Sequence, residues 1–158
     1  MTQTPISRNL GLEATFKADH REVDGQWAAV EAAVERGDAD AVASAWQRFD
    51  ASLRRHLAME EEVLFPAFEA ATGMTQGGPT FVMRSEHTQM RGVLDQMAKA
   101  MERGDHDELV DQGDTLLILI QQHNAKEEGM LYPMAERALG GQWSALRERL
   151  AGYFDDPN

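Results

Sequence analysis

The stretch HLAMEEEVLFPAFE at residues 56–69 returns 67 positions later as HNAKEEGMLYPMAE at residues 123–136. When residues 14–69 and 81–136 are aligned without a gap, 15 of 56 positions are identical. A repeat of this length that occurs only twice indicates a duplicated pair of helices rather than a solenoid array.

Glycines mark the ends of the elements within each copy. Gly37-Asp38 and Gly104-Asp105 are typical of tight helix–helix turns, in which glycine takes the left-handed cap and aspartate starts the next helix. The segment 72–79 is rich in glycine and separates the two halves. We therefore predict helices over about 12–35, 39–70, 80–103 and 106–137.

Apolar side chains recur at alternating spacings of three and four along all four predicted helices. The fourth carries Leu109, Gly113, Leu116, Ile120, His123, Glu127, Met130 and Met134 in its seam. This pattern predicts an all-α, antiparallel up-down-up-down four-helix bundle with a short C-terminal helix. Pro66 and Pro133 should kink or end the second and fourth helices.

The composition fits one domain of 158 residues with an ordinary hydrophobic content. We expect an N-terminal tail at 1–11, the bundle at 12–137 and an amphipathic C-terminal segment and tail at 138–158. In that segment Trp143, Leu146, Leu150 and Phe154 share one side, which caps the bundle or forms a partner surface, such as that of a homodimer.

The charge and the residue types exclude several classes of function. A net charge of −12 argues against nucleic-acid binding. No apolar run is long enough to span a membrane, and no signal-peptide pattern begins the sequence, so we expect a cytoplasmic protein. The lack of cysteine excludes thiolate zinc sites and iron–sulfur clusters held by this chain.

Six polar residues interrupt the apolar seams: His20, His56, Glu60, His87, His123 and Glu127. Residue 38 is the midpoint of the histidine pair in the first half, and residue 105 is the midpoint of the pair in the second half. Because residues equidistant from a turn lie side by side in an antiparallel pair, all six should meet in one layer. A buried carboxylate is unfavourable unless it is compensated, which indicates bound cations.

Imidazole and carboxylate ligands without sulfur favour iron, manganese or zinc. Six ligands are too many for one tetrahedral zinc ion. The six ligands suit two metal ions instead. Each ion would be held by two histidines, and the two carboxylates would bridge the ions. Two iron ions joined by an oxide or hydroxide fit best, and manganese or zinc fit less well. His106 lies outside the seams and is predicted to be a surface residue.

The order His20 … His56-x-x-x-Glu60 … His87 … His123-x-x-x-Glu127 resembles the hemerythrin-like, HHE cation-binding family over about residues 12–137. The resemblance implies a four-helix bundle whose non-haem di-iron centre reacts with dioxygen or related small molecules. It also implies that each half's two histidines hold one iron and that the glutamates bridge. Ferritin-like bundles need an acidic residue three positions before histidine. Those positions hold Lys17, Leu53, Arg84 and Ile120.

Oxygen-carrying members of that family have a fifth histidine at the position of Arg91. Its loss implies a nearly symmetric centre, suited to peroxide or nitric oxide chemistry or to a labile iron reservoir rather than to reversible oxygen carriage. Either Arg91 points to solvent or a carboxylate takes the histidine's place, for which Glu86 and Glu22 are candidates.

Three functions stay open at this point. The first is a di-iron protein that binds or senses dioxygen, nitric oxide or peroxide. The second is a catalase-like or peroxidase-like enzyme, against which the predicted layer offers no dedicated acid–base residue. The third is an iron storage or donor module related to the family's iron–sulfur repair members, to which the likeness is limited to this domain.

Overall fold

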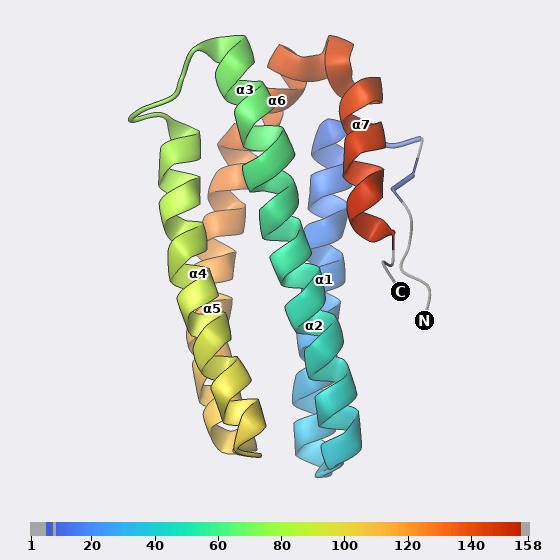
Figure 1. Cartoon of the computed structure of the whole chain (residues 1–158), viewed down its shortest axis with the longest axis vertical. Coiled ribbons are helices and arrows are strands. Elements are labelled where there is room, and N and C mark those ends of the chain that lie inside the picture. The colour runs from blue at the N-terminus through green and yellow to red at the C-terminus, as the bar shows by residue number, and fades with distance from the viewer. Residues whose placement is uncertain (1–5, 8, 156–158) are drawn as a thin grey trace.

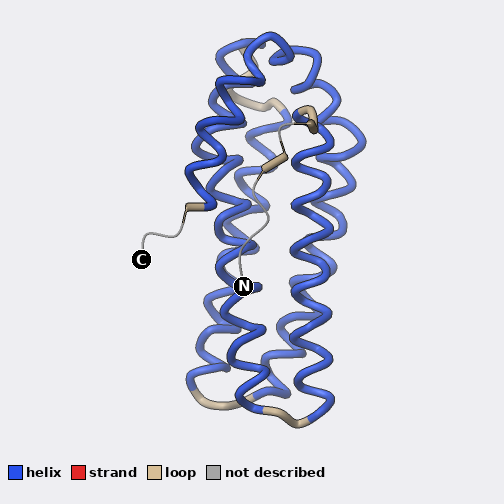
Figure 2. The backbone as a smooth tube through the Cα atoms, turned by 90° about the vertical axis from the view of Figure 1, so that its right-hand side faces the viewer, coloured by secondary structure: helices blue, strands red, loops and turns tan. Residues whose placement is uncertain are grey.

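The chain folds into a bundle of helices in the computed structural model, which describes residues 6, 7 and 9–155 (Figures 1 and 2). No strand occurs among these residues, which confirms the prediction of an all-α fold. Most of the expected N-terminal tail lies outside the described residues, as does the end of the C-terminal tail, residues 156–158.

The long helices of the bundle pair in sequence order. In Figure 1, α1 lies beside α2 and α4 beside α5, with the short turns of both pairs at the lower end. The bounds are α1 Leu12–Arg36, α2 Ala39–Met59, π-helical η1 Glu60–Leu64, α3 Phe65–Thr72, α4 Pro79–Glu102, α5 His106–Lys126, π-helical η2 Glu127–Leu131, α6 Tyr132–Leu139, 3₁₀-helical η3 Gly140–Gln142, α7 Trp143–Ala151 and 3₁₀-helical η4 Gly152–Phe154. The predicted ends of the helices agree with these bounds to within about two residues.

The turns form as their sequences predict. Gly37 and Gly104 both adopt the left-handed conformation, with φ of 69°. Asp38 accepts a hydrogen bond from the amide of Ala41 at 3.1 Å and so caps the start of α2. Asp105 caps α5 in the same way. Because of these turns, α2 lies beside α1 and α5 lies beside α4.

The two prolines follow wide π-helical turns. Pro66 lies at the start of α3, directly after η1, and Pro133 holds the same position in α6 after η2. A proline has no amide hydrogen and its ring crowds the preceding turn, so the wider turn accommodates it. Arg84 donates through Nη1 to the carbonyl oxygen of Glu61 at 3.3 Å. The helical rods therefore continue past the prolines, and the expected break takes the form of a π turn.

Each π turn adds one residue and so changes which side chains face the core. Met130, predicted to lie in the inward seam, is 49% exposed, whereas Leu131 and Tyr132 are buried. In the first half Phe68 is buried and Ala67 only partly so. The seam prediction is wrong here because it carries the α-helical period through a turn that has a longer one.

Two apolar clusters of described residues lie on either side of a polar layer. The lower cluster, toward the short turns, includes Trp27, Phe49, Leu94 and Leu116. The upper cluster includes Phe16, Phe65 and Tyr132 together with Leu146 and Leu150 of α7. The C-terminal helix α7 therefore packs against the upper part of the bundle (Figure 1).

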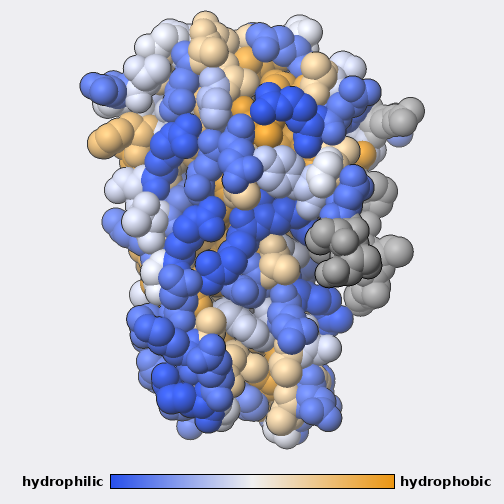
Figure 3. Space-filling model, viewed as in Figure 1, coloured by the Kyte–Doolittle hydropathy of each residue, from blue (hydrophilic) through white to orange (hydrophobic). Residues whose placement is uncertain are grey.

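The outer face of the bundle in Figure 3 is largely hydrophilic, and apolar side chains show there only in small areas. Most charged side chains of the helices are exposed or only partly buried, so the apolar seams face one another. Within the described part of the chain, no helix combines the length and the apolar character that crossing a membrane requires.

Candidate metal centre

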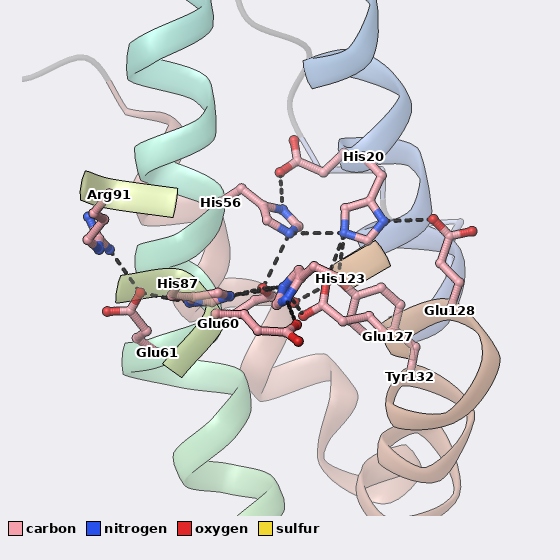
Figure 4. A network of polar contacts seen from close by, with 12 residues as sticks. His20, His56, Glu60, Glu61, His87, Arg91, His123, Glu127, Glu128 and Tyr132 are labelled. Atoms are coloured by element: carbon pink, nitrogen blue, oxygen red, sulfur yellow. Dashed lines mark hydrogen bonds and ion pairs between the residues drawn. The ribbon is translucent and has the colours of Figure 1, made fainter. Parts of the chain in front are cut away.

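All six side chains singled out in the sequence lie in the layer between the two clusters (Figure 4). None of them is more than 4% exposed. Among the described residues they form two groups that share both glutamates: His20, His56, Glu60 and Glu127, and Glu60, His87, His123 and Glu127. Within each group one ligand atom per residue lies within 4.8 Å of the others, so each group could hold a metal ion.

The two groups repeat one arrangement. Nε2 of His20 lies 3.2 Å from Nε2 of His56, and Nε2 of His87 lies 3.2 Å from Nε2 of His123. Oε1 of each half's glutamate lies 3.1 Å from Nε2 of the first histidine of the other half. The glutamates thus cross between the halves, which is the arrangement that two bridging carboxylates require.

Each of the four histidines in the layer has a carboxylate at its outer nitrogen, Nδ1. The pairs are His20 with Glu128 at 2.7 Å, His56 with Asp19 at 2.7 Å, His87 with Glu61 at 2.8 Å, and His123 with Glu86 at 2.8 Å. A carboxylate can only accept, so each Nδ1 carries a proton, and in the neutral imidazole the lone pair of Nε2 faces into the layer.

Inside the layer, carboxylate oxygens lie close to histidine Nε2 atoms, and both are hydrogen-bond acceptors when the imidazoles are neutral. Oε1 of Glu60 and Oε2 of Glu127 are buried and have no hydrogen-bond partner of adequate geometry in the described part of the chain. Histidine Nε2 atoms nevertheless lie 3.1, 3.2 and 3.4 Å from these oxygens. Lone pairs directed at one another in a buried site are stabilised by a cation. Nitrogen and oxygen ligands of this kind fit iron, manganese or zinc.

Protons supply the positive charge when no metal ion does. Burial lowers the pKa of His123, but Glu127 and Glu60 outweigh burial and raise it to about 10. Burial likewise opposes the effect of Glu60 and Asp19 on His56, whose pKa is raised well above its ordinary value. Burial raises the pKa of Glu60, but the charge of His56 and hydrogen bonds with Glu127, His123 and His56 together lower it well below its ordinary value. Protons and metal ions therefore compete for these imidazoles.

Tyr132 brings a hydroxyl into the layer. Its Oη donates to Oε2 of Glu60 at 2.7 Å and lies 2.9 Å from both Oε1 of Glu127 and Nε2 of His20. Burial and the two carboxylates raise the pKa of Tyr132 well above its ordinary value, so it stays protonated. The layer therefore contains a hydroxyl group that the sequence analysis did not predict.

The repeat places a phenylalanine where the second half has this tyrosine. Phe65 stands 67 positions before Tyr132. The centroid of each ring lies 5.4 Å from the centroid of the first histidine of the other half. The two rings thus pack alike, and the hydroxyl is the difference between them. Patterns of hydropathy do not indicate this site residue, because tyrosine and phenylalanine are equally suited to an aromatic core position.

Arg91 lies at the edge of the site and does not point freely to solvent. Its Nη2 donates at 2.9 Å to Oε2 of Glu61, the atom that also accepts from Nδ1 of His87. Glu86 contacts the outer nitrogen of a histidine, and Glu22 is exposed. Neither carboxylate takes the place of a fifth histidine. His106, predicted at the surface, is the first residue of α5 and belongs to neither group.

A cavity of about 10 Å³ adjoins three of the four histidines: His20, His56 and His123. Its other lining residues include Val23, Leu53 and Met90. A volume of this size is close to that needed by one water molecule. The histidine layer is therefore next to a space suited only to a very small molecule.

Comparison with known proteins gives one finding. A family model described as the hemerythrin HHE cation binding domain matches residues 12–135. The match spans the paired long helices and all six residues of the two groups. No curated protein and no solved structure matches the chain.

Proposed function

The chain belongs to the hemerythrin HHE cation-binding domain family, and on this basis we propose that it binds or senses dioxygen, nitric oxide or peroxide at a non-haem di-iron centre. The observation that carries the proposal is a buried layer in which four imidazole nitrogens face two carboxylates, each with one oxygen that lacks a hydrogen-bond partner among the described residues. One iron would be held by His20 and His56, the other by His87 and His123, and both by Glu60 and Glu127.

The bound iron pair would supply electrons and coordination positions to the small molecule. The chain's own residues determine what reaches that pair. The outer carboxylates orient the imidazoles and raise their basicity. The apolar clusters above and below exclude water, and the small cavity admits only a molecule of a few atoms. Its apolar lining favours an uncharged one.

A visible absorption spectrum tests the proposal. Protein loaded with iron(II) without oxygen is exposed in turn to dioxygen, hydrogen peroxide and nitric oxide. We expect absorption bands of the iron centre to change with at least one of them. The bands that depend on the iron pair should be lost in His56→Ala and present in His106→Ala, a matched loss of an imidazole outside the layer. An iron-loaded protein whose spectrum is unaltered by all three molecules would contradict the proposal.

A second candidate function is peroxide consumption by a catalase-like or peroxidase-like reaction. The observation in its favour is the hydroxyl of Tyr132, a protonated group within the layer that can give a proton to a reacting molecule. Oxygen evolution, or oxidation of an added donor, should follow addition of peroxide and decline in Tyr132→Phe with its metal content unchanged. No turnover in the wild type leaves binding or sensing as the function.

We also propose the up-down-up-down order of the long helices and a domain at 12–137, followed by the C-terminal segment at 138–158. The left-handed turns at Gly37 and Gly104 support antiparallel pairs. The packing of α7 on the upper cluster supports a C-terminal segment that serves the bundle. Limited proteolysis should release fragments from the termini and leave the bundle intact.

A further inference from the structure

The two groups in the layer have the same kinds of ligand atom and share both glutamates, but the charged residues around them differ. We call His20 with His56 the first half-site and His87 with His123 the second half-site. In the second half-site a cation is paired with each outer carboxylate. Arg91 donates to Glu61 at 2.9 Å, and Lys126 forms an ion pair with Glu86 (Figure 4 shows the first of these).

The first half-site has no such pairs. The positions 67 residues before Arg91 and Lys126 hold Asp24 and Met59. Within the described part of the chain, Glu128 forms no ion pair with a lysine or arginine. Asp24 lies close enough to His20 and Glu128 to interact electrostatically with both: burial is the main cause that raises its pKa, Glu128 also raises it, and His20 lowers it.

Arg55 interacts electrostatically with the remaining outer carboxylate, Asp19. It makes no ion pair with Asp19 within 4.0 Å among the described residues, and its guanidinium lies over the ring of Phe154, 4.2 Å from the centroid. Burial lowers the pKa of Arg55, while Asp19 and Glu22 both raise it. Its charge is therefore shared with a second carboxylate.

The net charges of these surroundings can be compared directly. Around the second half-site, two outer carboxylates are balanced by two cations, for a net charge of zero. Around the first, no lysine or arginine among the described residues forms an ion pair with either of the two outer carboxylates, for a net charge of −2 on the same criterion. The glutamates between the half-sites are common to both and do not alter the difference.

We infer that the two half-sites are unequal and that a divalent metal ion binds more tightly at the first half-site than at the second. An uncompensated carboxylate on Nδ1 makes an imidazole a stronger ligand, and an arginine or lysine on that carboxylate weakens this effect. The more negative surroundings also attract the ion. The ion at the second half-site is then the one that exchanges. The inference requires that the layer bind two ions, as the proposed function does.

The expected difference in metal affinity between the half-sites can be estimated from the effect of altering the hydrogen-bond partner of a ligating histidine. Alteration of one partner of a ligating histidine typically changes metal affinity by about 10- to 100-fold. Both outer carboxylates differ between the half-sites here. We therefore expect the two dissociation constants to differ by at least about tenfold.

Titration of the metal-free protein with cobalt(II) tests the order of binding, because cobalt(II) reports its ligands by visible absorption. Two steps should appear, separated by at least about tenfold. His56→Ala should remove the tight step, and His123→Ala should remove the weak one. A single unresolved step, or a tight step that is lost in His123→Ala, would overturn the inequality and leave the di-iron proposal intact. No cobalt binding at all would overturn both.

Exchange of the charged residues between the half-sites tests whether these charges cause the difference in metal affinity. Arg91→Asp with Lys126→Met gives the second half-site the residues of the first, and the weak step should tighten by about tenfold or more. The converse variant Asp24→Arg should weaken the tight step. Arg103→Asp matches the charge change of Arg91→Asp at an exposed helix end, and both steps should stay as in the wild type. Unchanged separation in the exchanged variants would contradict the inference.

Discussion

At the scale of single residues, the layer is organised by which atom of each imidazole carries a proton. A carboxylate outside the layer fixes that proton on Nδ1, and the Nε2 atoms are left to face Glu60 and Glu127. Tyr132 is the one hydroxyl among the described residues that donates to these two glutamates. The consequence is a site that needs protons or metal ions to be stable.

Replacement of Tyr132 by phenylalanine should therefore affect the metal-free protein most. The change removes the one O–H donor that lies within hydrogen-bond distance of both buried carboxylates, and we expect the free energy of unfolding to fall by about 1–3 kcal/mol. With iron bound the loss should be smaller, because cations then compensate the oxygens. Denaturant unfolding of both forms measures the difference.

Tyr153→Phe is the matched control for that measurement. Its hydroxyl donates to Glu62 at 2.6 Å on the exposed side of the bundle. We expect a change within about 0.5 kcal/mol, as for most surface substitutions. An equal loss of stability in Tyr132→Phe with and without iron would contradict the role given to the hydroxyl.

The pH dependence of the metal-free protein follows from the raised histidine pKa values. A group whose pKa is raised by folding contributes stability below its unfolded pKa of about 6.5 and loses it as the pH rises through the folded value. For His123 that value is about 10. We expect the metal-free protein to lose stability from about pH 6.5 to about pH 10, by a few kcal/mol.

The iron-loaded protein should behave in the opposite way. Its histidines must be neutral to bind metal, so protonation of the unfolded chain destabilises the fold below about pH 6.5. Unfolding free energies of both forms across this range measure the contrast. A metal-free protein whose stability rises between pH 7 and pH 10 would contradict the assignment of protons to the layer.

The site residues differ in how far the sequence reveals them. Polar residues in an apolar seam stand out, which is why the six inner residues can be predicted together. The outer carboxylates do not stand out, because Asp19 and Glu61 resemble ordinary surface charges. The repeat holds a usable signal, since an acidic residue precedes His20 and His87 and another follows each inner glutamate. Only the structure shows that these point to Nδ1 atoms.

At the scale of helices, the π turns η1 and η2 place the inner glutamates. Each begins at the glutamate itself and ends just before the aromatic residue that packs on a histidine. The sequence signal is the proline that follows, Pro66 or Pro133, but a proline equally predicts a kink or an end of the helix. Which outcome occurs depends on packing across the bundle, such as the contact of Arg84 with Glu61.

Close contact between α1 and α5 depends on the lack of a side chain at Gly113. A Cβ added to Gly113 would lie 2.1 Å from the ring of Trp27, which is buried in the lower cluster. We expect Gly113→Ala to lower the free energy of unfolding by about 1–3 kcal/mol, since overpacking displaces the ring. Thermal or denaturant unfolding measures the loss.

Gly92→Ala is the control for the same replacement on an exposed helix surface. A Cβ at Gly92 meets nothing within 4 Å, so helix propensity alone should act and stabilise the protein by about 0.5–1 kcal/mol. The two variants should thus change stability in opposite directions. A stabilising effect of Gly113→Ala would show that α1 and α5 do not pack as described.

At the scale of the whole molecule, a polar layer divides the apolar interior into two clusters. The long helices run through both clusters, so disruption of the layer should destabilise the whole bundle. The duplicated sequence predicts this architecture well, because each half supplies one helix pair and one set of candidate ligand residues. It also suggests a symmetric centre, which the charges of Arg91, Lys126 and Asp24 break.

Metal binding should therefore stabilise the fold as a unit. Iron(II) at a free concentration one hundred times its dissociation constant should raise the free energy of unfolding by about 2.7 kcal/mol for each site filled. Magnesium, which prefers oxygen ligands, should have little effect under the same conditions. Unfolding in denaturant without oxygen, with each metal in turn, measures the contrast. Equal effects of the two metals would point to nonspecific binding to the acidic surface.

The most direct test of the metal layer is the amount of iron bound per folded chain after anaerobic loading and removal of free metal. We expect two ions per chain in the wild type. We also expect two in His106→Ala and fewer than two in His56→Ala, because only the second of these imidazoles belongs to the layer. A fully folded wild-type protein that retains no iron would contradict the account.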